Sequence, residues 1–455
     1  MMTQPTSYPE RFLVASTLFV LVWLPLPLGS NRDWSAGLLI LLVSFLGVVW
    51  VVNQVRGGIK LGSRNKTLRV ALPMLGLLLL TQVWVALQWL TGMSMDNGAT
   101  LQYLSLGLAY SLLFLLIIST FHTRQRLVLL LSVLIISGTF QAFYGAYMSL
   151  SGSKSILASI GFGHSRVTNG TFVNRNHLAG YLEMTLACGI GLLLALRDGK
   201  PFRWISVLEL LMGAKARLRL ALVVMVIALV MTNSRMGNTA FFVSLIGVGT
   251  LFILRNREHR ARNSLILISL IIIDMLVISQ YFGLERLKER VVNTHFQDVI
   301  VEGEVVQQDN VIRLDINAYI LPLAMEKPLV GEGAGSFEAV FPAYAGEDVR
   351  SHFDHAHNDY MQFIIEYGLI GSLPLLAFAL LALWRALQAL WRRESLFRSG
   401  IGFGAVMGII SIGIHSAVDF NLQIPANAAT FTVLCAIAVL ANNHSNPRHK
   451  PILKY

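Results

Sequence analysis

Long apolar runs separated by short polar segments make up most of the chain. A helix needs about 17 to 25 apolar residues to cross a bilayer, and it satisfies its own backbone polar groups there. Runs close to this length occur at twelve places: 12–29, 34–55, 68–90, 101–121, 127–150, 177–196, 218–233, 237–254, 263–282, 358–383, 400–418 and 424–441. The pattern predicts an all-α polytopic membrane protein with about twelve transmembrane helices.

One polar segment, 283–356, is long enough to form a folded lid over the membrane helices. It contains six basic and thirteen acidic residues. Apolar spacing predicts a helix over 311–325, and clustered glycines predict a turn over 328–335. We therefore divide the chain into nine helices at 1–282, a large extracytoplasmic loop at 283–356 with the catalytic segment at its end, and three helices with a cytoplasmic tail at 357–455.

Composition and charge agree with a membrane location. Hydrophobic residues form 55% of the chain and charged residues 13%, against about a quarter in an average soluble domain. The net charge of +11 comes mainly from Lys and Arg on one side of the predicted helices, as in cytoplasmic loops. Both termini are therefore predicted to be cytoplasmic, with membrane lipids and no nucleic acid as partners. Cys188 and Cys435 lie inside apolar runs, which argues against a disulfide or a cysteine metal site.

The polar sequence 354–360, Asp-His-Ala-His-Asn-Asp-Tyr, opens the tenth apolar run. Titratable groups at the start of a membrane helix are costly to bury, so they mark a candidate site. An imidazole exchanges protons near neutral pH, and His357 is therefore a candidate base. Two other readings stay open. His357 could cap the tenth helix, or His352 and its neighbours His355, His357, Asp354 and Asp359 could bind a metal.

Two arginines occupy the outward side of the predicted helices, where basic residues are scarce. Arg175 begins the sixth run and Arg235 stands just before the eighth. A guanidinium at the bilayer boundary suits a phosphate or pyrophosphate, although many such arginines only reach toward lipid headgroups. Arg313 is a weaker third candidate. Asp419, at the outer end of the eleventh run, could orient an arginine or a sugar hydroxyl, or could simply be a turn residue.

The sequence lacks the motifs of several enzyme classes. There is no acidic pair on a short outward loop, no phosphate-binding glycine-rich loop before a helix and no GxSxG sequence. Metal-dependent nucleotide-sugar chemistry and ATP hydrolysis are therefore not supported. We expect no cofactor and no metal, and a donor that already carries its pyrophosphate and arrives through the lipid.

These motifs resemble the O-antigen ligase and O-antigen polymerase superfamily of bacterial envelope glycan transferases. The family pattern is matched by His357-Asn358, nine further residues, Gly368 and Gly371. The segments 313–337 and 355–362 look like its signature block. The sequences 170–177 and Ser234-Arg235 look like its two arginine motifs. The resemblance spans roughly residues 160 to 425.

The resemblance implies a GT-C-like inner-membrane glycosyltransferase whose active face is periplasmic. Such enzymes transfer a glycan from undecaprenyl diphosphate to an acceptor hydroxyl, without metal and with inversion. By similarity, Arg175 and Arg235 would hold the pyrophosphate and His357 would position or deprotonate the acceptor. The residues implied to bind substrate are Arg313, Asn358, His355, Asp419 and Asn176.

The sequence leaves open which acceptor is used and whether the protein is an enzyme, a transporter or an assembly protein. An O-antigen ligase uses lipid A core, whereas a polymerase uses a second lipid-linked glycan, and the segment 415–428 resembles the exopolysaccharide branch as much as the ligases. A lipid-linked glycan transporter would need ionisable residues in mid-membrane. The sequence shows Asp274 clearly, with Glu183 and Glu209 less so. A non-catalytic assembly protein is a third reading and would tolerate loss of the histidine.

Overall fold

The chain folds into a bundle of long helices. The structure, a computed structural model, describes residues 8–57, 66–151, 168–196, 216–255, 264, 268, 272, 299–301, 304–306, 309–346, 349, 352–392 and 394–445. Its helices are α1 (Tyr8–Trp23), α2 (Asp33–Arg56), α3 (Lys66–Leu90), α4 (Asn97–Thr120), α5 (Arg124–Ser151), α7 (Arg175–Ala195), α9 (Ala216–Met231), α10 (Arg235–Arg255), α13 (Asp309–Glu326), α14 (Phe337–Val340), α15 (Asp359–Leu390), α16 (Leu396–His415) and α17 (Pro425–Asn443). The strands β1 (Val299–Val301) and β2 (Glu304–Val306) form a small antiparallel hairpin, which the sequence did not predict.

Nine helices of the described chain are long and apolar enough to cross a membrane. Each coincides with a predicted run. The runs at 12–29 and 218–233 correspond to α1 and α9, which have 16 residues each, and the run at 263–282 lies almost wholly outside the described residues. The protein is therefore a nearly all-helical membrane protein, as predicted, while the total of twelve spans stays a prediction.

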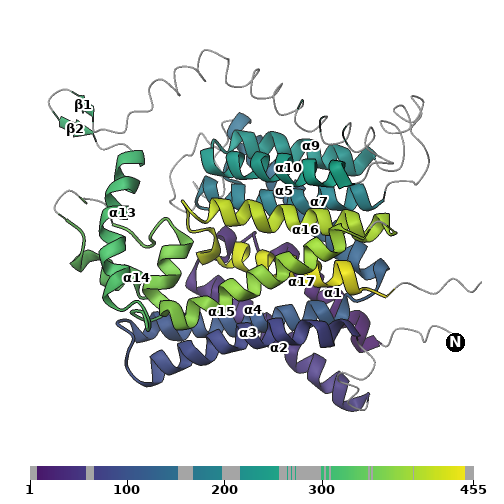
Figure 1. Cartoon of the computed structure of the whole chain (residues 1–455), viewed down its shortest axis with the longest axis horizontal. Coiled ribbons are helices and arrows are strands. Elements are labelled where there is room, and N and C mark those ends of the chain that lie inside the picture. Colours follow the sequence, from purple (N-terminus) through teal and green to yellow (C-terminus); the bar gives the residue numbers. More distant parts are fainter. Residues whose placement is uncertain are drawn as a thin grey trace, which may run out of the picture.

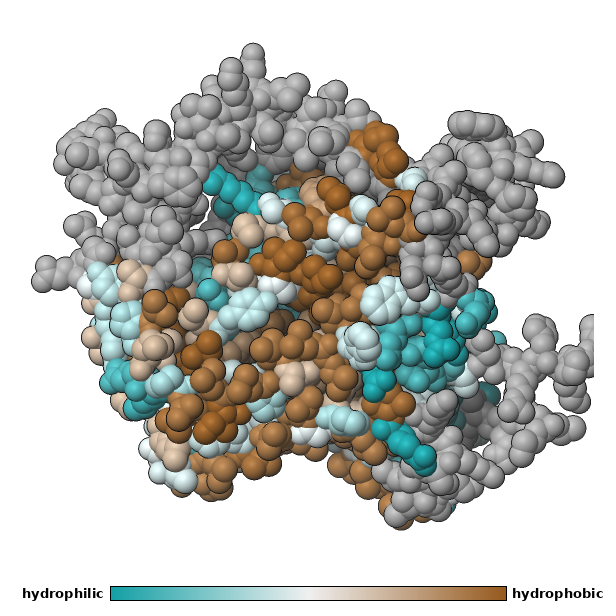
Figure 2. All heavy atoms as spheres, viewed as in Figure 1, coloured by the Kyte–Doolittle hydropathy of each residue, from teal (hydrophilic) through white to brown (hydrophobic). Residues whose placement is uncertain are grey.

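The surface agrees with a lipid environment. Large apolar side chains point outward along α2, α5 and α15, where Leu41, Phe143 and Leu373 are 56–64% exposed. Figure 2 shows hydrophobic residues across the middle of the molecule and hydrophilic ones toward its two ends. This distribution is the one expected of helices that cross hydrocarbon and end in water.

The helices pack in layers around α16. On one side α16 contacts α7 and α10, and on the other it contacts α15 and α17, while α15 in turn packs against α3 (Figure 1). Close contact between α7 and α16 depends on small residues, because a Cβ on Gly191 would lie 2.8 Å from the Cα of Gly404. Small residues let membrane helices approach each other closely.

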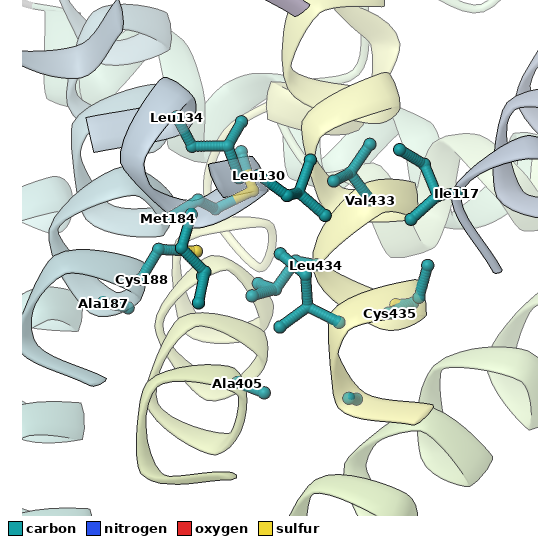
Figure 3. Close-up of a cluster of buried hydrophobic side chains, with 14 of the residues drawn as sticks. Ile117, Leu130, Leu134, Met184, Ala187, Cys188, Ala405, Val433, Leu434 and Cys435 are labelled. Atoms are coloured by element: carbon teal, nitrogen blue, oxygen red, sulfur yellow. The ribbon is translucent and has the colours of Figure 1, made fainter. Parts of the chain in front are cut away.

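The core lies where these layers meet. Figure 3 shows side chains from several helices converging there, among them Leu134 of α5, Met184 and Cys188 of α7 and Leu434 and Cys435 of α17. Every residue of α7 from Asn176 to Ala195 is buried. Both cysteines are buried free thiols. Any polar group on α7 therefore has to find its partners inside the protein.

The end of the bundle that carries α13 and α14 has a small core of its own (Figure 1). Ile320 and Leu323 of α13 pack with Phe337 and Phe341 and with Ile365 in the first turns of α15. The helix α13 confirms the one predicted over 311–325. The last part of the predicted loop is thus packed directly onto the start of a membrane helix.

A glycine-rich turn locks into a break in α15. Gly368 has φ +60° inside α15 and interrupts the helical geometry there. The broken turn exposes backbone groups that the predicted turn over 328–335 satisfies, since Leu369 donates to Pro328 O at 2.8 Å and Gly333 donates to Glu366 O at 2.9 Å. Gly368 is required because a Cβ would collide with the Leu329 carbonyl and because its φ favours glycine.

Helix α3 satisfies the remaining groups of this break. The side chain of Gln88 donates to Val330 O at 2.7 Å and to Glu366 O at 2.9 Å, and Trp84 Nε1 donates to Tyr367 O at 2.8 Å. Irregular backbone at membrane depth persists only where protein groups replace the missing helical bonds. The predicted run at 358–383 corresponds to α15, and the break at Gly368 inside it was not predicted because its partners come from distant segments.

Candidate active site

The segment before α15 is held in a strained and ordered conformation. His357 has φ +49°, a left-handed value that is uncommon for residues other than glycine and that clusters at functional sites. Asn358 is the N-cap of α15, and its Oδ1 accepts from Met361 N at 3.1 Å. Asn358 rather than His357 therefore caps the helix, and the capping reading of His357 is not supported.

Three histidines from two distant segments surround one phenylalanine. The ring of Phe420, in the turn after α16, lies 4.5 Å from His355, 4.8 Å from His357 and 4.6 Å from His177 of α7, measured between centroids. Phe420 therefore joins the polar sequence 354–360 before α15, called the signature segment below, to the start of α7. Neither Phe420 nor His177 was predicted as a site residue. Their signal in the sequence was that they belong to the motifs at 415–428 and 170–177.

A hydrogen-bond network orients His355. Gln362 Nε2 donates to His355 Nδ1 at 2.9 Å, and the same amide donates to Glu366 Oε1 at 2.9 Å while its Oε1 accepts from Ala356 N. His355 Nδ1 is thus an acceptor, so the ring proton resides on Nε2. Burial, with His177 and His357 nearby, lowers the pKa of His355 to about 3. His355 is therefore a neutral imidazole at physiological pH and suits hydrogen bonding to a hydroxyl.

Asp359 ties the signature segment to the turn after α16. Its side chain is buried and accepts from Ser416 Oγ at 2.7 Å, Leu422 N at 3.0 Å and Gln423 Nε2 at 3.3 Å. These bonds use both carboxylate oxygens, so Asp359 has a structural role here. Through Asp359, the turn that carries Phe420 is fixed against the start of α15.

Asp419 lies between two buried histidines. Its Oδ1 is 3.7 Å from His177 Nε2, and its Oδ2 is 3.9 Å from His415 Nε2. Phe420 N donates to Oδ1 at 2.8 Å. Asp419 is only 1% exposed, so it is more than a residue of a solvent-exposed turn.

The two candidate arginines stand at the N-termini of adjacent helices. Arg175 is the first residue of α7 and is half-buried, and Arg235 is the first residue of α10 and is exposed. The two helix starts are packed together, because a Cβ on Gly237 would lie 2.7 Å from the Cβ of Ala179. Helix N-termini carry partial positive charge, which adds to that of the guanidinium groups.

The turn before Arg235 is also unusual. Asn233 has φ +55°, and Ser234 Oγ accepts from Gly237 N at 3.2 Å, so that α10 begins abruptly at Arg235. Arg175 is two residues from His177, whose ring packs on Phe420. The starts of α7, α10 and α15 therefore meet at one end of the bundle.

Two of the expected substrate-binding residues have no role assigned by this geometry. Arg313 lies in α13, but its side chain is outside the described part of the structure. Asn176 is 9% exposed, and its backbone N–H donates to Asn174 Oδ1 at 2.9 Å. Asn174 is thus the N-cap of α7, and Asn176 lies in the first turn behind it.

The metal reading is not supported by the placement of its residues. His355 and His357 pack on Phe420, and Asp359 binds the turn after α16. His352 instead lies with two carboxylates, its Nε2 being 2.8 Å from Glu338 Oε1 and 3.4 Å from Asp354 Oδ1. All three side chains are exposed. Ordinary surface ion pairing accounts for this group.

An apolar groove begins beside the site. Its volume is about 450 Å³, and its walls come from α3, α4, α15, α16 and α17. Leu373, Leu376 and Leu380 of its lining are 47–56% exposed toward the lipid. Ser416 and Gln423, which bind Asp359, also line it. The groove therefore runs from the outer surface of the bundle to the residues that bind Asp359.

Fold and site together define a polytopic membrane protein with a polar, histidine- and arginine-bearing site at one end of its bundle. Residues 220–376 match the family model described as O-antigen ligase. The match runs from α9 into α15 and includes Arg235, the signature segment and Gly368. This match confirms, over that part of the chain, the resemblance to the O-antigen ligase superfamily inferred from the motifs. No curated protein matches the chain.

Proposed function

We propose that the protein transfers a glycan from undecaprenyl diphosphate to an acceptor hydroxyl at the periplasmic face of the inner membrane. In this proposal it is an O-antigen ligase, its acceptor is lipid A core, and the reaction inverts the anomeric carbon without a metal. The observation that carries the proposal is the meeting of the starts of α7, α10 and α15, which brings Arg175, Arg235 and the signature histidines to one end of the bundle.

The arginines bind and stabilise the leaving group. When the acceptor oxygen attacks the anomeric carbon, the bond from that carbon to the diphosphate oxygen breaks and its electron pair goes to the diphosphate. A guanidinium offers paired hydrogen bonds to phosphate oxygens and keeps its charge at all relevant pH values. Fixed positive charge placed where negative charge develops is often the largest single catalytic effect.

The histidines act on the acceptor. His357 accepts the proton of the attacking hydroxyl, or positions that hydroxyl for attack, and releases the proton to solvent. The neutral His355 hydrogen-bonds hydroxyls nearby. Asp419, packed beside His177, orients a sugar hydroxyl. In these assignments His357, His355 and Asp419 each interact with a hydroxyl of the glycan or of the acceptor.

The apolar groove accommodates the hydrocarbon chain of a lipid-linked substrate. Gly413 of α16 lines it and faces open space, since a Cβ there would meet only Tyr360 Oη, at 3.5 Å. We expect Gly413→Leu to raise the KM for the lipid donor about tenfold with little change in kcat, because buried apolar contact of this size is worth about 1–2 kcal/mol. Initial rates in liposomes at varied donor concentration measure KM and kcat. Gly247→Leu, at another open glycine on α10, is the control, and an unchanged KM in Gly413→Leu would remove the lipid from this groove.

The decisive experiment distinguishes ligase from polymerase. Purified protein in liposomes is given undecaprenyl-diphosphate-linked glycan, first alone and then with lipid A core, and products are identified by mass spectrometry. Glycan joined to lipid A core supports the ligase. Longer lipid-linked glycan formed without lipid A core supports the polymerase, which the segment 415–428 also resembles. No product from either mixture contradicts a glycan transferase.

Activity is expected to survive metal chelation. The signature histidines are engaged with Phe420 and Gln362, and diphosphate charge is met by guanidinium groups. Turnover in excess EDTA should therefore stay within about twofold of the untreated rate. Loss of activity that zinc restores would contradict the metal-independent mechanism and direct attention to the exposed group of Glu338, His352 and Asp354.

A further inference from the structure

A buried polar pair lies beneath the histidine cluster. His415 Nδ1 of α16 is 2.7 Å from Glu183 Oε1 of α7, and Ser411 Oγ donates to Glu183 Oε2 at 2.7 Å. Both members of the pair are fully buried, inside two helices that each qualify as membrane spans. Nothing in the mechanism above uses them.

Packing between α7 and α16 does not require this pair. The two helices already meet through Gly191 and Gly404 and through Gly400 against the backbone of Ala195. An ionisable pair inside a membrane protein is costly, and replacing such a pair by well-packed apolar residues is often neutral or stabilising. A polar pair at this position therefore points to a role other than holding the helices together.

The pair is connected to the site through Asp419. His415 has its second nitrogen, Nε2, 3.9 Å from Asp419 Oδ2, and the opposite oxygen Oδ1 is 3.7 Å from His177 Nε2. Neither Nε2 has a hydrogen-bond partner among the described residues, although both are buried. His177 then packs on Phe420, which also contacts His357. Polar side chains thus follow one another from Glu183 through His415 and Asp419 to His177, which packs on Phe420 at the site.

The position of His415 between Glu183 and Asp419 indicates its charge state. A ring that lies between two carboxylates can satisfy both only as an imidazolium, with one N–H directed at each. In that form the charge of His415 is shared by Glu183 and Asp419. Glu183 also lies against the start of α10, because its Oε1 would be 3.1 Å from a Cβ on Gly237, two residues after Arg235.

We propose that Glu183 and His415 are positioning residues for glycan transfer, which act by holding the Asp419 carboxylate toward His177 at the base of the site. This role rests on the proposed function and deepens it. Glu183 fixes His415, and His415 fixes Asp419, whose carboxylate then meets the sugar or acceptor hydroxyls in one orientation. In this role the pair contacts no substrate and acts through Asp419.

The test compares Glu183→Gln, Asp419→Asn and the double variant in liposomes with undecaprenyl-linked glycan and lipid A core. Glu183→Gln keeps the shape but removes the charge, and we expect kcat to fall at least tenfold with both KM values within about twofold. Because Glu183 acts through Asp419, the double variant should be no slower than Asp419→Asn alone, within about twofold. Thr185→Val changes a buried residue of α7 whose hydroxyl donates to Tyr181 O and Leu182 O of the same helix, and it should retain normal activity.

Several results would overturn the role. Unchanged kcat in Glu183→Gln, or a double variant whose losses multiply, would show that Glu183 does not act through Asp419. If Glu183→Gln does not yield folded protein, Glu183→Gln with His415→Gln replaces the charged pair by two amides, and full activity of that variant would overturn the role. Wild-type protein that is inactive with these substrates would refute the proposed function and this role together, whereas active wild-type protein with an active Glu183→Gln variant would refute this role alone.

Discussion

Replacing Arg235 by alanine is expected to lower kcat by about 10²–10³-fold, the loss seen when one transition-state hydrogen-bond donor is removed. Arg235 is exposed at the first residue of α10, so its loss should leave folding intact. The charge that develops on the departing diphosphate would lose one of its guanidinium partners. Initial rates of glycan transfer in liposomes measure the effect.

Arg235→Lys refines this prediction. Lysine retains a positive charge but offers no planar fork, so binding of the diphosphate persists while paired hydrogen bonding is lost. We expect activity between that of wild-type protein and that of Arg235→Ala, with at least a tenfold loss. Arg56→Lys, at an exposed position at the C-terminus of α2, is the matched control and should be fully active. Undiminished turnover by Arg235→Lys would show that a point charge suffices.

Replacing His357 by alanine should reduce kcat by about 10²–10⁴-fold, the usual contribution of a positioned proton acceptor. Alanine is a poor residue for the positive φ of this position, so Asn is the better test, since it tolerates left-handed backbone. His357→Asn should preserve the segment before α15 and still be nearly inactive. Thermal unfolding of both variants reports whether the backbone is intact.

His352 supplies the control for this experiment. It lies five residues before His357, is exposed and pairs with Glu338. His352→Ala should retain wild-type rates, because its ring is not among those packed on Phe420. If His357→Asn kept more than about a tenth of wild-type activity, His357 would not be the proton acceptor, and the histidine next to it, His355, would be the alternative.

Much of the candidate site was recognisable from local sequence. The signature at 354–360, the arginines at the starts of two apolar runs and the glycine-rich turn over 328–335 each have a local signal. A charged or bulky polar residue at the end of an apolar run stands out because hydrocarbon excludes it. The spacing from His357 to Gly368 was also visible in the sequence, but the sequence did not show that Gly368 interrupts α15.

The long-range contacts of several residues could not be predicted from the sequence, although Glu183 itself was visible as an ionisable residue within an apolar run. Phe420 is an aromatic residue beside an apolar run, and His415 and Glu183 are single polar residues inside such runs, where no pattern links them. Glu183 and His415, for example, are over two hundred positions apart in the chain. Only packing reveals that they belong to one polar line.

The sequence by itself determined that this protein is a bundle of membrane helices, because each helix must be apolar over a length set by the bilayer and must satisfy its own backbone. It also determined where polar groups stand at helix ends, since those positions are excluded from hydrocarbon. The tertiary structure alone decided which of these ends meet, where α15 breaks at Gly368, and that Asp419 lies between His177 and His415. Such choices depend on hydrogen bonds and close packing between segments far apart in the chain, which no local pattern encodes.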